Sequence, residues 1–66
     1  MLSDNVKIDY TNYEGKRSWR TISPRRIDFG SNQWHPDKQW LLLAYDFDKE
    51  DFRSFAMANI HEWKAA

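Results

Sequence analysis

The chain has 66 residues, of which ten are basic and ten acidic, and it contains no cysteine. A chain of this length forms one domain with a small core, and the lack of cysteine excludes disulfide bonds and thiolate metal sites. The zero net charge argues against a dedicated nucleic-acid binder, which is usually basic overall. Aromatic residues make up 17% of the sequence, and we expect them to supply much of the apolar area of the core.

The first predicted element is a strand over residues 5–13. Val6, Ile8 and Tyr10 alternate there with polar residues, which is typical of a strand with one buried face. Gly15 then favours a tight turn, because glycine tolerates positive φ. The first two strands are therefore predicted to form a hairpin.

The second strand alternates over residues 17–22 and meets a proline two positions later. Pro24 lacks a backbone donor and restrains Ser23, so we expect the strand to end or bend there. A third strand is predicted to start at Ile27. It ends before the polar, turn-rich segment 31–38.

The fourth strand, residues 39–47, is followed by an acidic turn over 48–51 and a fifth strand over 52–57. Residues 57–66 favour one short helical turn, which needs packing to be stable. The fourth strand has two apolar rows, and one of them must face the interior. The rows are Leu41, Leu43 and Tyr45, which we assign to the interior, and Trp40, Leu42 and Ala44, although alternation alone is compatible with either choice.

Five short strands joined by turns predict an all-β fold, either a small sandwich or a barrel. We expect one domain over residues 4–63 and a short tail over 64–66. No apolar run approaches the ~18 residues of a membrane span, and the first residues lack the features of a signal peptide. The protein is therefore expected to be cytoplasmic.

Three segments of this sequence resemble the WYL domain of bacterial transcriptional regulators. They are SWRTISP (18–24), QWLLLAYD (39–46) and RSFAMANI (53–60). The positions that correspond to the family pattern are Tyr10, Ser18, Arg20, Ile22, Pro24, Trp40, Leu42, Ala44, Arg53, Phe55, Met57 and Ile60. Leu41 replaces the tyrosine of the family name, and Ala56 and Asn59 replace two arginines.

The resemblance implies a five-stranded barrel of the SH3 or Sm type. It also implies a site for single-stranded nucleic acid or a nucleotide-like effector, used in regulation. The ligand-binding residues carried over are Tyr10, Ser18, Arg20 and Arg53. Since the chain has no room for the helix-turn-helix domain of those regulators, we expect a free-standing WYL domain.

The two arginines are the strongest candidates because a guanidinium presents a fixed fork of donors to phosphate or carboxylate. A structural interpretation competes with this one. Arg20 and Arg53 could instead pair with an acidic residue on a neighbouring strand. The candidate partners are Asp9, Asp28 and Asp46.

A second candidate site is a patch that interleaves cations with an aromatic ring, as grooves for single strands do. Its residues are Lys16, Arg17, Trp19, Arg25 and Arg26. A tryptophan such as Trp19 is, however, more often a core or interface residue than a stacking platform. His35 and His61 have no metal-ligand or nucleophile spacing around them, so we expect no metal site, no cofactor and no enzymatic activity.

These features predict a non-enzymatic module that senses an oligonucleotide or a small anionic ligand in bacterial regulation. The alternative is a domain for self-assembly, or for contact with a regulatory protein, that uses an apolar surface around Trp40, Leu42 and Trp63.

Overall fold

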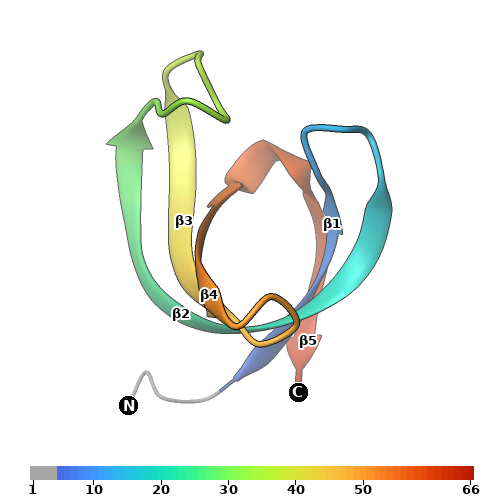
Figure 1. Ribbon diagram of the computed structural model, residues 1–66. Coiled ribbons are helices and arrows are strands. Elements are labelled where there is room, and N and C mark those ends of the chain that lie inside the picture. The colour runs from blue at the N-terminus through green and yellow to red at the C-terminus, as the bar shows by residue number, and fades with distance from the viewer. Residues whose placement is uncertain (1–4) are drawn as a thin grey trace.

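The fold is a single antiparallel sheet, seen in a computed structural model that describes residues 5–66. Its five strands lie in the order β4-β3-β2-β1-β5, and one short 3-10 helix, η1, is the remaining element (Figure 1). The elements are β1 (Val6–Thr11), β2 (Arg17–Gly30), β3 (Gln39–Asp46), β4 (Asp51–Ala56), η1 (Met57–Asn59) and β5 (Ile60–Ala65). The predicted all-β class is confirmed.

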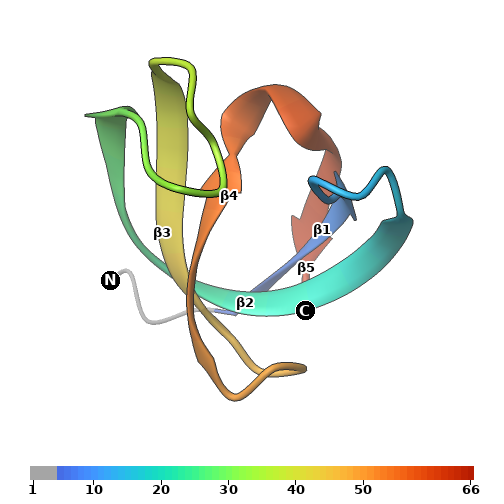
Figure 2. The same ribbon diagram turned by 45° about the horizontal axis from the view of Figure 1, so that its top comes forward.

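The second and third predicted strands are one strand, so the prediction of a separate third strand is wrong, and of the two outcomes expected at Pro24 the structure shows a bend and not an end. β2 runs without interruption for 14 residues, and its register against β3 shifts between Pro24 and Arg26. A bulge of this kind bends a strand and is one of the places where a sheet accepts proline. The first part of β2 pairs with β1 and the part from Ile22 onward pairs with β3, and Figures 1 and 2 show the strand curving across the whole sheet.

The C-terminal segment contains the expected short helical turn, but only over Met57–Asn59. The residues after it form β5, which pairs antiparallel with β1. Tyr10 lies opposite Ile60, and Ile8 lies opposite Trp63. β5 continues to Ala65, so the sheet includes two residues of the segment that we expected to be a tail.

The sheet is open, and the closed SH3- or Sm-like barrel is not confirmed. β4 and β5 are its two edges, and no ladder joins them within residues 5–66. A side chain bridges part of this gap, since the Tyr10 hydroxyl on β1 accepts the backbone N–H of Ala56 at the end of β4 (3.0 Å). The Tyr10 ring also meets Phe55 edge to face, with ring centroids 4.9 Å apart.

The core lies on the concave face of the curved sheet. Its buried members come from four strands and are Ile8, Tyr10, Ile22, Leu42, Ala44 and Phe55. The interior row of β3 is therefore the one with Leu42 and Ala44, and our assignment of Leu41, Leu43 and Tyr45 to the interior is wrong.

The sizes of the side chains give a physical reason for this orientation of β3. Ala44 is small and fully buried, and a larger side chain at this packed position would be destabilising. Tyr45 is larger and packs on the other face against the rings of Phe47 and Phe52, with centroids 5.1 and 5.2 Å away. On the second face, Tyr45 is thus covered in part by these two aromatic side chains.

We expect Tyr10→Phe to lower the free energy of unfolding by about 1–3 kcal/mol, because it removes the acceptor of a buried N–H and keeps the ring. Urea denaturation measures this loss. Tyr13→Phe is the matched control, since Tyr13 is exposed and its hydroxyl makes no hydrogen bond within the described residues. Equal stability of Tyr10→Phe and the wild type would show that the Tyr10–Ala56 hydrogen bond does not stabilise the fold.

Candidate functional site

A cavity of about 640 Å³ lies at one end of the core, within the size range of small-ligand sites. The core residues Tyr10 and Phe55 form part of its wall, and the turn after β1 and the loop between β2 and β3 form other parts. Its basic side chains are Arg20, Lys49 and Arg53, and Glu14 is the acidic one. The cavity therefore offers more positive than negative charge.

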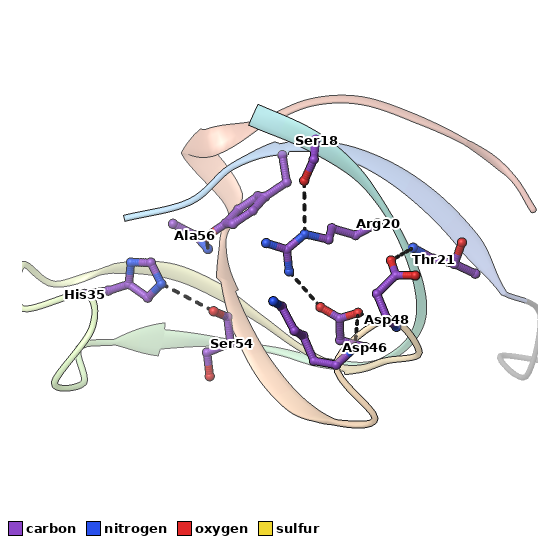
Figure 3. Close-up of polar contacts among 10 residues, drawn as sticks. Ser18, Arg20, Thr21, His35, Asp46, Asp48, Ser54 and Ala56 are labelled. Carbon is purple, nitrogen blue, oxygen red and sulfur yellow. Dashed lines mark hydrogen bonds and ion pairs between the residues drawn. The ribbon is translucent and has the colours of Figure 1, made fainter. Parts of the chain in front are cut away.

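The four predicted ligand-binding residues come together at this cavity. Tyr10, Arg20 and Arg53 line it, although they come from β1, β2 and β4. Ser18 lies beside them, because its hydroxyl accepts a hydrogen bond from Nε of Arg20 (3.2 Å; Figure 3). Burial raises the pKa of the Tyr10 hydroxyl above its usual range, so it remains a neutral hydrogen-bonding group.

Arg20 is also part of a buried ion pair, as the structural interpretation proposed. Its Nη1 donates to Oδ2 of Asp46 at 2.8 Å, and the Asp46 side chain is 0% exposed while that of Arg20 is 13% exposed. The other carboxylate oxygen of Asp46 accepts the backbone N–H groups of Asp48 (2.9 Å) and Lys49 (3.3 Å). Figure 3 shows Arg20 held between Ser18 and Asp46. Asp46 thus fixes both the arginine and the turn between β3 and β4.

The two other cations of the cavity are not engaged in this way. The side chain of Arg53 makes no ion pair or hydrogen bond with residues 5–66, and neither does the ammonium group of Lys49. Both residues are exposed. An anionic ligand in the cavity would therefore find its available charge on Arg53 and Lys49. Lys49 was not predicted as a site residue, because the acidic residues around it indicated only a solvated turn.

Two aromatic residues of the cavity were also missed. Tyr13 lies in the turn after β1, and Trp34 lies in the loop after β2. Their ring centroids are 5.4 Å apart, with the planes tilted by 42°. The only signal in the sequence was a large ring within each of two otherwise polar turn segments.

The predicted nucleic-acid patch is divided between two places on β2. At the start of the strand, Arg17 pairs with Asp9 through two hydrogen bonds (2.7 and 3.0 Å), and this contact lowers the pKa of the Asp9 carboxyl. Trp19 has the ammonium of Lys64 over its ring at 4.4 Å. Lys16 lies in the preceding turn, where its backbone N–H and C=O both bond to Asn12.

The remaining two cations of the patch lie at the bulge. Arg25 stands over the ring of Phe52, 5.5 Å from its centroid, and Arg26 pairs with Asp28 at 2.7 Å. These contacts leave the patch without a single continuous basic surface. Arg26 and Arg17 already have acidic partners, which reduces the charge that they offer to a phosphate.

The two histidines have separate structural contacts. His35 is buried, and its Nε2 donates to the carbonyl oxygen of Ser54 (3.3 Å; Figure 3). His61 is exposed and hydrogen-bonds with Thr11 (2.7 Å). In the part of the chain that the structure describes, no cluster of His, Asp and Glu side chains is suited to hold a metal ion. No helix among residues 5–66 is long and apolar enough to cross a membrane.

Comparison with protein families identifies the class to which this fold and site belong. The family described as the WYL domain matches residues 3–65, which is nearly the whole chain. The chain therefore belongs to the WYL domain family. Among curated proteins, none matches this sequence.

We expect Arg20→Met to lower the free energy of unfolding by about 3–5 kcal/mol, because it leaves a buried carboxylate unpaired. The double variant Arg20→Met, Asp46→Asn should regain at least half of that loss, since the amide keeps an acceptor for the turn and carries no charge. Urea denaturation of both variants measures the difference.

Arg26→Met is the matched control, because the Arg26–Asp28 pair is exposed and such pairs contribute only about 0–1 kcal/mol. If Arg20→Met were no more destabilising than Arg26→Met, the buried pair would not hold the fold together.

Proposed function

We propose that this WYL domain is a non-enzymatic binding module, which senses an oligonucleotide or a small anionic ligand in bacterial regulation. The observation that carries the proposal is the cavity in which Arg53 and Lys49, both without partners in the described chain, lie beside the fixed Arg20. Arginine and lysine at the edge of a concave site are suited to phosphate. Membership of the WYL family supports the same class of function.

The three positions that depart from the family pattern lie outside the lining of this cavity. Leu41, Ala56 and Asn59 are the changed positions, and none of them lines it. Leu41 and Ala56 are buried, and the backbone N–H of Ala56 is bonded to Tyr10. The basic and polar groups of the cavity are therefore present without the family's tyrosine and its two later arginines.

The proposal assigns different tasks to the predicted ligand residues. Arg53 contacts the anion directly, together with Lys49. Arg20 has five N–H donors, of which Ser18 and Asp46 each occupy one, so the others can face a ligand. Ser18 and Tyr10 position Arg20 and the edge of β4.

The test is the salt dependence of binding to a single strand of about ten nucleotides, which is within the usual range of site sizes. Two phosphate contacts, at ~0.7 each, predict a log–log slope of affinity against salt near −1.4. Arg53→Gln and Lys49→Gln should each weaken binding and bring the slope to about −0.7. Fluorescence anisotropy with a labelled strand measures both quantities.

Lys7→Gln is the control with the same change of charge. Lys7 is exposed and alternates with the core residue Ile8 on β1, so it lies on the other face of the sheet. It should leave the slope unchanged. Binding with a slope close to zero, or an equal effect of all three variants, would contradict contact between the cavity and phosphates.

Self-association is the second candidate function, and one observation favours it. Trp40 is 57% exposed and packs edge to face on the exposed Phe29, with ring centroids 5.1 Å apart. Of the other predicted anchors, Trp63 is exposed, but Leu42 is 3% exposed and belongs to the core. Exposed aromatic pairs of this kind often serve as interface anchors.

We expect sedimentation of the full chain to show concentration-dependent association that Trp40→Ser abolishes. High salt should leave this association unchanged or strengthen it slightly, because apolar contact releases no counterions. A monomer at all concentrations would exclude self-association through Trp40.

A further inference from the structure

Two large aromatic side chains stand at the cavity with much of their surface in solvent. Tyr13 is 62% exposed and Trp34 is 54% exposed, although their rings are in contact with each other. Neither ring belongs to the hydrophobic core. Their apolar area therefore contributes little to folding, and burying it against a ligand would be favourable.

Both rings are held on turns that the sequence fixes with an asparagine. Oδ1 of Asn12 accepts the N–H groups of Glu14 and Lys16, each at 2.9 Å, and Gly15 provides the positive φ of 83° that this turn needs. Tyr13 lies within this turn. The ring is thus presented on a short, internally bonded segment.

The second turn is fixed in the same way and is also anchored to the sheet. Oδ1 of Asn32 accepts the N–H groups of Trp34 (2.9 Å) and His35 (2.8 Å). The buried His35 ring then bonds to the carbonyl oxygen of Ser54 on β4 (3.3 Å), as Figure 3 shows. A ring on such a segment loses little conformational freedom when a ligand binds, so the surface is pre-organised.

The geometry of the pair determines how a planar ligand could use it. A ring inserted between Tyr13 and Trp34 would need two van der Waals gaps, which together are about 7 Å. The centroids are only 5.4 Å apart, so there is no room between them. A planar group must instead stack on the free face of a ring, at the side that borders the cavity.

We propose that Tyr13 and Trp34 form a stacking subsite for a planar heteroaromatic ring whose phosphate is bound by Arg53 and Lys49. The subsite rests on the proposed function, since all four residues line the same cavity. Stacking on aromatic side chains beside a cationic groove is the usual mode of recognition for unpaired bases. The ligand is therefore a nucleoside phosphate, either free or as a unit of a single strand.

The experiment compares three probes on the full chain. They are an oligothymidine strand, an abasic sugar-phosphate strand of the same length, and thymidine monophosphate. The wild type should bind the oligothymidine at least about fivefold more tightly than the abasic strand, because one stacked base contributes that much or more. Trp34→Leu should remove this difference and leave abasic binding unchanged.

Two further variants separate stacking from a general loss of structure. Trp34→Phe keeps a ring and should restore most of the preference for bases. Phe47→Leu removes a ring that is 44% exposed but does not line the cavity, so it should leave both affinities unchanged. If Trp34→Leu loses its circular dichroism spectrum, Tyr13→Ala takes its place, with a smaller loss of the same preference expected.

The outcomes distinguish the subsite from the proposed function. Equal binding of the oligothymidine and abasic strands by the wild type overturns the stacking subsite and leaves phosphate binding intact. Failure of all three probes to bind overturns both. A Trp34-dependent affinity for thymidine monophosphate supports the subsite with a free nucleotide as ligand, and a Trp34-dependent affinity for the strand alone supports it with a single strand as ligand.

Discussion

The buried ion pair between Arg20 and Asp46 is the interaction on which the site depends. It lies at the end of the β2–β3 ladder, where Asp46 is opposite Ile22 and the Phe47 N–H donates to the carbonyl oxygen of Thr21. A buried pair gains little stability over a well-packed apolar one, since both charges must lose water. The role of this pair is to position the groups around it, because Asp46 also accepts two backbone N–H groups of the turn before β4. The same carboxylate thus places Arg20 and the turn that carries Lys49.

The cationic side chains of the cavity are of two kinds, one held in an ion pair and two without an acidic partner in the described chain. Arg20 is held by Asp46 and contributes its remaining donors, whereas Arg53 and Lys49 keep their full charge for a ligand. With a net charge of zero, the protein has no long-range field that would draw nucleic acid toward it. Under the proposed function, recognition therefore depends on contacts inside the cavity, where the geometry of each group matters more than the total number of cations.

Local patterns in the sequence predicted β1, β3 and β4 closely, because each alternates or ends at a clear turn signal. They could not predict the unbroken β2, since Pro24 is compatible with either an end or a bulge, and only the partner strand decides. β5 was missed because Ile60–Ala65 has no strong alternation, and its conformation depends on pairing with the distant β1. The predicted interior row of β3 was wrong because both rows alternate with the same period, and only the packing of the folded sheet places Leu42 and Ala44 in the core.

The candidate site was predictable to the extent that its residues lie on strands. The family pattern identified Tyr10, Arg20 and Arg53, which the curvature of the sheet brings to one cavity. It contained no information on Tyr13 and Trp34, because they lie on two turns that become neighbours only in the folded chain. The strands thus carry the core and the arginines, and the turns carry the exposed rings. If the proposed stacking subsite is correct, substitutions in the turns change which ligand is accepted without disturbing the core.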